Sequence, residues 1–403
     1  MQHNTPFNRR EFLKTGISGI AMVGAASCLP PAARALSLFG GNNPASSGSA
    51  DIRGRIFEND APATLWKWSR EAFAYTTRSK DTTICGICPN SCILTPGNRG
   101  VCRSKVNING KLYSLAYGNP CAVHLDPIEK KPLFHFRPAS RAFSIAAAGC
   151  NFRCLNCQNW QISQRNPEAL RHHDMFPEAV VASARQAGAT AIAYTYSEPT
   201  TFFEYMYDTA MIARQHNLSN LWISNGYINH EPLLSLCKVL DAANVNLKSF
   251  SNALYKKLNG GTLQPVLDTF ITLHQQNVHF EMTNLVVPGY TDDPAMFAEM
   301  CNWIHETLGP DHPLHLLRFH PQYKLRRLAP TPVAILTRFR EIAMSAGIHY
   351  VYVGNVPGHE GENTFCHHCK KMIIQRNGYR MGDIHIKEGK CEFCDATIPG
   401  VWS

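Results

Sequence analysis

The sequence has no internal repeat and no long low-complexity segment, which excludes a repeat architecture. Its 39 lysine and arginine residues are scattered, and no basic stripe with interleaved aromatic residues occurs. Nucleic-acid binding is therefore not expected, although the net charge of +9 suits an acidic partner or a nucleotide cofactor. The apolar stretch from Ile17 to Leu29 is too short, and too rich in glycine and alanine, for a stable membrane span.

Cysteine, by contrast, is abundant. Eleven of the 15 cysteines fall into three groups with the spacing of metal ligands. Cysteines separated by two residues rarely form a structural disulfide with each other, but they readily bind one metal. The sequence therefore predicts three metal sites rather than a disulfide framework.

The central group has the pattern C-x3-C-x2-C and consists of Cys150, Cys154 and Cys157. Three thiolates on one loop can bind three irons of a [4Fe–4S] cluster and leave the fourth iron without a protein ligand. That iron can chelate S-adenosylmethionine (SAM), and one electron then cleaves the sulfonium bond to give a 5′-deoxyadenosyl radical that abstracts hydrogen. Zinc and ferredoxin-type sites usually have four cysteines, so the missing fourth cysteine favours the open-iron cluster.

The C-terminal group contains two C-x2-C pairs with a 21-residue spacer, at Cys366, Cys369, Cys391 and Cys394. This pattern is typical of a zinc-ribbon or rubredoxin-like module. Four thiolates complete a tetrahedral shell, so we expect a closed structural zinc site, with redox iron as the alternative.

The N-terminal group has x2, x3 and x9 spacing and consists of Cys85, Cys88, Cys92 and Cys102. Four ligands suit either structural zinc or an auxiliary [4Fe–4S] cluster, and the spacing matches neither common ferredoxin pattern. The sequence does not decide between zinc and an auxiliary cluster, and it slightly favours zinc. Cys121 lies just beyond the group and could replace one ligand.

From about residue 141, short apolar runs alternate with amphipathic segments of helical length. The expected strands are residues 142–148, 190–196, 220–224, 245–248, 278–287, 314–319 and 349–353. The expected helices include residues 177–186, 232–243, 265–276, 294–307 and 332–346. This order predicts an α/β fold with a parallel sheet covered by helices, and six or seven units fit a partial (β/α)6 barrel.

Unusual polar residues follow the predicted strands. Barrel enzymes place their chemistry at the carboxyl ends of the strands, where side chains from different strands converge. Besides the first cysteine of the central group, the candidates at these positions are Glu198, Asn225, Lys248 and His320.

Several ordered blocks carry a family resemblance from about residue 82 onward. They are Cys85-Gly-Ile-Cys88-Pro, Asp126-Pro-Ile-Glu-Lys-Lys-Pro132, Gly149-Cys150-Asn151 through Gln158-Asn159-Trp160, Tyr194-Thr-Tyr-Ser-Glu198-Pro-Thr200, Val353-Gly-Asn-Val-Pro357 and Ile398-Pro-Gly-Val-Trp402. The chain resembles the pyruvate formate-lyase activating enzyme-like radical SAM proteins, and most of all their AmmeMemoRadiSam-system subgroup.

The resemblance implies roles for the four polar candidates. Glu198 would contact the SAM amino group and Asn225 the ribose, while Lys248 and His320 would approach SAM. The implied activity is hydrogen abstraction from a substrate, with a glycyl-radical activase as the family-level function. The alternative is an exported iron–sulfur electron-transfer protein without SAM chemistry.

The N-terminus carries the twin-arginine export signature Asn8-Arg-Arg-Glu-Phe-Leu-Lys14, and Ala33-Arg-Ala35 offers a cleavage site. We expect folding in the cytoplasm and export to the periplasm, with the place of activity open. The expected partners are SAM, a low-potential electron donor and, as one option, a protein substrate. The expected divisions are a signal peptide at 1–35, a linker at 36–80, a four-Cys module at 81–140, the barrel at 141–350 and the ribbon at 351–403.

Overall fold

The computed structural model describes residues 65–402, which all belong to one compact unit. The predicted signal peptide and twin-arginine motif lie outside the described residues. Within them, no helix has both the length and the apolar character needed to cross a membrane.

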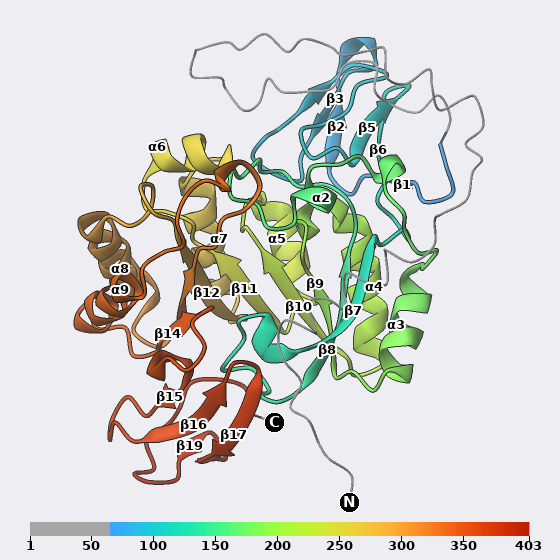
Figure 1. Ribbon diagram of the computed structural model, residues 1–403. Helices are drawn as coiled ribbons and strands as arrows, with labels where there is room; N and C mark the ends of the chain where they lie inside the picture. Colours follow the sequence, from blue (N-terminus) through green and yellow to red (C-terminus); the bar gives the residue numbers. More distant parts are fainter. Residues whose placement is uncertain (1–64, 403) are drawn as a thin grey trace, which may run out of the picture. The chain divides into compact units, whose positions relative to one another are not determined.

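An eight-stranded sheet forms the centre of the unit, in the order β14-β13-β12-β11-β10-β9-β8-β7 (Figure 1). Strands β8 to β14 are all parallel to their neighbours, and β7 pairs antiparallel with β8 at the edge. The strands are β7 (Ala122–Pro127), β8 (Arg141–Ala146), β9 (Ala191–Tyr194), β10 (Ser219–Ser224), β11 (Ala242–Asn246), β12 (His279–Val286), β13 (Leu314–Arg318) and β14 (Val351–Gly354).

Helices connect the parallel strands and pack against the sheet. They are α2 (Trp160–Ser163), α3 (Pro177–Gln186), α4 (Phe203–Gln215), α5 (His230–Cys237), α6 (Asn252–Leu254), α7 (Gln264–Gln275), α8 (Pro294–Leu308) and α9 (Val333–Ser345). A π-helical turn, η7 (Tyr255–Asn259), follows α6 directly. The repeated β-then-α order predicted from the sequence is thus present, and the sheet core is parallel as expected.

One predicted boundary was wrong. The helix expected over residues 232–243 ends at Cys237, and β11 begins at Ala242 instead of Val245. Ala242 and Ala243 pair with Leu221 and Trp222 of β10. These two residues, which the apolar pattern assigned to the helix, therefore belong to the strand. Leu236, Val239, Leu240 and Ala243 keep the helical spacing of three and four residues past the end of the helix, which hides the boundary in the sequence.

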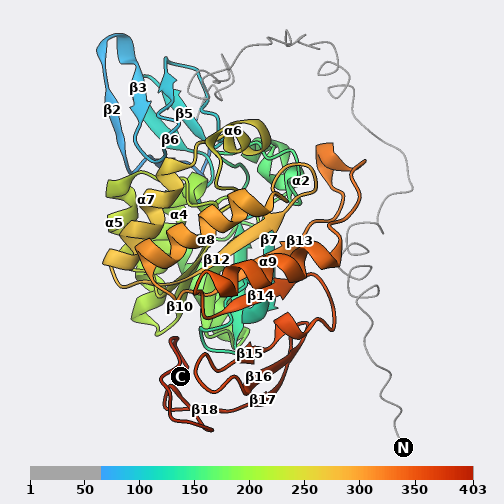
Figure 2. The ribbon, with the colours of Figure 1, turned by 90° about the vertical axis from the view of Figure 1, so that its left-hand side faces the viewer.

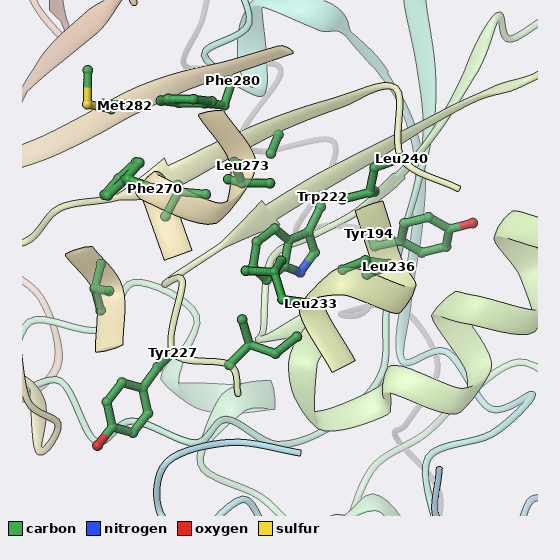
Figure 3. Packing of buried hydrophobic residues seen from close by; sticks show 14 of the residues in the cluster. Tyr194, Trp222, Tyr227, Leu233, Leu236, Leu240, Phe270, Leu273, Phe280 and Met282 are labelled. Atoms are coloured by element: carbon green, nitrogen blue, oxygen red, sulfur yellow. The ribbon is translucent and has the colours of Figure 1, made fainter. Parts of the chain in front are cut away.

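The two faces of the sheet are filled differently because successive strand residues point to opposite sides. On the helix-covered face, Trp222 of β10 is fully buried among Leu233 and Leu236 of α5 and the neighbouring α7 side chains (Figure 3). On the other face, small residues such as Ala193 join a separate apolar cluster with the segment before β8. On this second face, which the helices do not cover, the small side chains leave space for polar groups.

The N-terminal module consists of two small three-stranded sheets. Their strands are β1 (Arg70–Glu71), β2 (Tyr75–Thr77), β3 (Thr83–Cys85), β4 (Ile93–Leu94), β5 (Lys105–Ile108) and β6 (Lys111–Ser114). The linker predicted to reach residue 80 therefore ends earlier. Its last residues pair with the module, β1 with β6 and β2 with β3, which the short polar sequence did not reveal.

The C-terminal module lies at the opposite end of the sheet from the N-terminal module (Figure 2). It contains β15 (Thr364–Phe365), β16 (Met372–Asn377), β17 (Arg380–Ile384), β18 (Ile386–Lys387) and β19 (Lys390–Cys391). A buried polar network joins it to the sheet. His135 donates its backbone N–H to Glu281 of β12, and its ring nitrogens contact Pro399 O and Tyr352 Oη, each at 2.6 Å.

Candidate cofactor site

The loop between β8 and α2 carries the three cysteines of the central group, Cys150, Cys154 and Cys157, all half-buried. Each sulfur has a hydrogen-bonding neighbour of its own. The backbone N–H of Phe152 lies 3.3 Å from the first sulfur, Asn259 Nδ2 3.2 Å from the second, and Ser163 Oγ 3.2 Å from the third. Hydrogen bonds to cysteine sulfurs stabilise the thiolate form that binds iron and tune the reduction potential of a bound cluster.

Asn151 anchors this cluster loop, residues 149–157, from three directions. Its backbone carbonyl accepts from Asn90 Nδ2 of the N-terminal module at 2.9 Å. Its side-chain oxygen accepts from Asn225 Nδ2 at 2.8 Å, and its side-chain nitrogen donates to Tyr227 O at 2.7 Å. The loop is therefore held rigidly before any cofactor binds, which lowers the entropic cost of binding.

The π-helical turn η7 forms the opposite wall of the cluster loop. Asn259 and Leu258 accept backbone hydrogen bonds from Arg153 at 2.7 Å and from Leu155 at 2.8 Å. A Cβ on the following Gly261 would lie 2.1 Å from the Phe152 ring, so this approach requires glycine. π-helical turns are frequent at functional sites, and this one aims the Asn259 side chain at a cluster sulfur.

Burial weakens the acidity of two free thiols of the loop. It raises the pKa of Cys150 well above its ordinary value, and the nearby Glu198 carboxylate adds to this effect. Burial also raises the pKa of Cys157, with the Cys154 sulfur contributing. Because iron binding must displace these protons, the hydrogen-bond donors around the sulfurs favour the metal-bound form. The loop thus offers three thiols, each with a hydrogen-bonding neighbour, and this arrangement fits a [4Fe–4S] cluster.

Glu198 follows β9 and is 1% exposed. Its Oε1 atom accepts from Thr200 N, Thr200 Oγ1 and Ser224 Oγ at 3.0, 2.8 and 2.7 Å. Its Oε2 atom accepts from the Asn225 backbone N–H at 2.9 Å and can accept from a second donor. Burial raises the pKa of Glu198, and these hydrogen bonds oppose the effect. Glu198 thus ties the ends of β9 and β10 together near Cys150 of the cluster loop.

The other three polar candidates differ in their surroundings. Asn225 uses its amide within the protein, since Nδ2 donates to the cluster loop and Oδ1 accepts from Tyr227 N at 2.9 Å. Lys248 lies two residues beyond β11, where Nζ donates to Asn246 Oδ1 at 3.3 Å. Its charge reaches the cluster loop, where it acts on the Cys157 thiol. His320 is exposed after β13. The structure therefore brings Glu198 and Asn225 together, Lys248 close by, and leaves His320 at the surface.

A further polar cluster is one that sequence reasoning missed. Asp126 of β7 forms ion pairs with Lys130 and Lys131, each at 2.6 Å, and Tyr196 donates to the same carboxylate. Burial lowers the pKa of Lys131 to about 8, while Asp126 counteracts the shift. Tyr196 precedes Glu198 by two residues and has a left-handed backbone with φ of 63°. Two of the six sequence blocks that carry the family resemblance, Asp126–Pro132 and Tyr194–Thr200, meet here, and this was the signal available in the sequence.

The C-terminal cysteines have the geometry of a single-metal site. The four sulfurs, from Cys366, Cys369, Cys391 and Cys394, all lie within 4.8 Å of one another. Two of their separations are 3.7 and 3.8 Å, and a tetrahedral metal with bonds of about 2.3 Å requires sulfurs about 3.8 Å apart. The backbone N–H of Lys371 lowers the pKa of Cys369 to about 7, which favours the thiolate. The predicted closed four-thiolate site is thus geometrically formed.

Comparison with known proteins supplies the family. The family model of the radical SAM superfamily matches residues 144–301, which include the cluster loop. An uncharacterized protein of Methanocaldococcus jannaschii is 43% identical over 331 residues, covering 82% of this chain and 98% of that protein. The chain belongs to the radical SAM superfamily. Membership of this superfamily implies a [4Fe–4S] cluster and SAM as cofactors.

More distant relatives of this radical SAM protein include activating enzymes. Pyruvate formate-lyase 1-activating enzyme of Escherichia coli is 22% identical over 219 residues, covering 49% of this chain and 87% of that enzyme. Among solved structures, a radical SAM methyltransferase from Sphaerobacter thermophilus has a TM-score of 0.43 and 15% identity over 54% of this chain and 67% of its own. A domain of a pyruvate-formate lyase-activating enzyme from Bacteroides vulgatus has a TM-score of 0.37 and 12% identity, covering 41% and 99%.

The residues of the cluster loop fit the cofactors of this superfamily. When bound at such a loop, a [4Fe–4S] cluster with one open iron holds SAM and supplies the electron that cleaves its sulfonium bond. The protein holds the three sulfurs on one loop and gives each a hydrogen-bonding neighbour, with the Glu198 carboxylate near enough to act on Cys150.

Proposed function

We propose that this radical SAM protein is an enzyme that binds its [4Fe–4S] cluster at Cys150, Cys154 and Cys157 and abstracts hydrogen from its substrate. The observation that carries the proposal is the cluster loop, with three cysteine sulfurs and a hydrogen-bonding neighbour for each. In this proposal Glu198 accepts from the SAM amino group through Oε2, and the hydrogen bond from Asn225 to Asn151 supports the position of the loop. Lys248 and His320 are assigned contacts with SAM by the family resemblance.

The finer parts of the proposal rest on the resemblance and on the sequence. We assign a glycyl-radical activase function because a distant Escherichia coli relative is, by its name, an activating enzyme. Zinc in the C-terminal site, a partial barrel formed by the parallel sheet, and the AmmeMemoRadiSam-system subgroup belong to the same proposal. So do a low-potential electron donor and twin-arginine export of the folded protein. The alternative, an electron carrier without SAM chemistry, is not favoured by the comparisons.

Anaerobic reconstitution tests the proposal. The reduced protein is studied by electron paramagnetic resonance (EPR) with and without SAM, and 5′-deoxyadenosine is measured in the same samples. We expect a cluster signal that changes with SAM and nucleoside that is lost in Cys154→Ala. Cys237→Ala, which removes a cysteine outside the three groups, is the matched control and should retain both.

A second variant tests the SAM contact. Glu198→Gln keeps the shape of the side chain but removes its charge, so the affinity for SAM should fall while the iron content stays near that of the unaltered protein. A cluster signal that does not respond to SAM, with no nucleoside released, would overturn the enzyme proposal and restore the electron-carrier alternative.

A further inference from the structure

The four N-terminal cysteines converge inside the N-terminal module. Cys85 ends β3, the next two lie in the turn before β4, and Cys102 precedes β5. Cys85, Cys92 and Cys102 are 6%, 5% and 8% exposed, and Cys88 is half-buried. Four cysteines gathered in one small module can supply a complete set of ligands for a metal centre.

Hydrogen-bond donors surround these sulfurs as they surround those of the cluster loop. Ser104 Oγ donates to the Cys102 sulfur at 3.4 Å. The backbone N–H groups of Ile87 and Asn90 donate to the Cys85 and Cys88 sulfurs. Gly100 leaves room beside two of the sulfurs, since a Cβ there would lie 3.6 Å from the Cys92 sulfur and 3.8 Å from that of Cys102. Hydrogen bonds of this kind stabilise the thiolate form in which cysteine binds a metal.

The spacing of the sulfurs separates two kinds of site. Within residues 65–402, the C-terminal four cysteines have their sulfurs within 4.8 Å of one another, as one tetrahedral metal requires. No three of the N-terminal four are that close, and neither are the three sulfurs of the cluster loop, again among the described residues. In a [4Fe–4S] cluster each cysteine binds a different iron, so the sulfurs stand apart by the width of the cluster. Like the cluster loop, the N-terminal group therefore lacks the compact spacing of the C-terminal site, which argues against a single tetrahedral metal.

The N-terminal module also rests directly on the cluster loop. A Cβ on Gly149, the residue before the first cluster cysteine, would lie 2.3 Å from the carbonyl oxygen of Cys102. Asn90, between two of the N-terminal cysteines, donates to Asn151 O at 2.9 Å. The segments that carry the two cysteine groups are therefore in direct contact.

We propose that Cys85, Cys88, Cys92 and Cys102 hold a second [4Fe–4S] cluster, fully ligated by the protein, beside the SAM cluster. It takes one electron from a flavodoxin- or ferredoxin-type donor, changing from [4Fe–4S]2+ to [4Fe–4S]+. It returns to the 2+ state when that electron passes to the SAM cluster, and no bond or proton is transferred. The proposal of a cluster site depends only on the N-terminal residues. The proposal of electron transfer to the SAM cluster rests on the proposed function.

Sulfide content decides between this cluster and zinc, because a mononuclear zinc or iron site contains no sulfide. The full chain is reconstituted anaerobically with iron and sulfide in the presence of zinc chloride, and acid-labile sulfide is counted per chain. We expect about eight sulfides, falling to about four in Cys88→Ser/Cys92→Ser and to about four in Cys150→Ala/Cys154→Ala/Cys157→Ala. About four sulfides in the unaltered protein, with about two zinc ions, would overturn the proposal.

EPR of the same samples separates failure of this proposal from failure of the proposed function. The N-terminal double variant should keep the SAM-sensitive signal, and the triple variant should keep a signal that SAM does not change. Eight sulfides with no SAM-sensitive signal would refute the proposed function but leave the second cluster standing. Should the double variant fail to fold, Mössbauer spectroscopy of the unaltered protein counts the clusters directly, and one cluster per chain refutes the site.

Discussion

Replacement of Gly149 by alanine tests whether the N-terminal module and the cluster loop are in tight contact. Gly149 has φ of 102°, a conformation that costs an L-residue about 1–2 kcal/mol. The added Cβ would lie 2.3 Å from Cys102 O, which is 1.1 Å short of the 3.4 Å at which ordinary contact begins (3.4 − 2.3). Overpacking of this kind costs about 1–3 kcal/mol more. The total loss of stability should therefore be about 2–5 kcal/mol.

Gly358→Ala provides the matched control for this prediction. Gly358 also has a positive φ, 82°, but a Cβ there meets nothing within 4 Å. Its loss of stability should stay at about 1–2 kcal/mol, the cost of the backbone conformation alone. Urea unfolding followed by tryptophan fluorescence measures both losses, and iron and sulfide retention is measured alongside. If Gly149→Ala loses no more stability and no more iron than Gly358→Ala, the contact between the two cysteine groups is refuted.

Three further predictions follow from single contacts. Asn259→Leu removes the donor to the Cys154 sulfur, so the SAM cluster should have a more negative reduction potential in an EPR-monitored titration; an unchanged potential contradicts the assigned hydrogen bond. Lys105→Met leaves its buried partner Glu204 without a counter-charge and should cost about 3–5 kcal/mol in urea unfolding, part of which Lys105→Met/Glu204→Gln should recover. Burial lowers the pKa of His135 to about 4, below the unfolded value of about 6.5, so stability present above pH 6.5 should fall by about 3 kcal/mol as the pH drops to 4. This pH dependence should weaken by that amount in His135→Gln, and an identical profile for the variant would contradict the assignment.

The sequence predicted the parallel strands because their apolar runs are long and regularly interrupted by helix signals. Helix α3 agrees with its predicted bounds, since Pro177 marks its first turn and the chain leaves the helix after Gln186. The edge strand β7 was not predicted. His124 and Leu125 are exposed and Asp126 is buried, so β7 lacks the apolar pattern of the other strands.

The candidate site was predictable where it depends on spacing and not where it depends on distant contacts. The three cysteines of the cluster loop are close in sequence, and their pattern is specific. Asn259 donates to the Cys154 sulfur across 105 residues, so no local pattern could reveal it. The same holds for Asn90, which is 61 residues from Asn151. An asparagine in an unremarkable loop carries no signal of such a role.

The polar network beneath the sheet has a consequence for how the chain folds. His135 meets Pro399 across 264 residues, and Val401 donates its backbone N–H to His135 O at 2.7 Å. Contacts that close so long a loop form late, because the entropy of closure is lost before the contact is gained. Docking of the C-terminal module is therefore expected to be a late kinetic step. An intermediate that already has the sheet but lacks this module would expose Tyr352 and Glu281, and it would be the species most prone to aggregation and most dependent on chaperones.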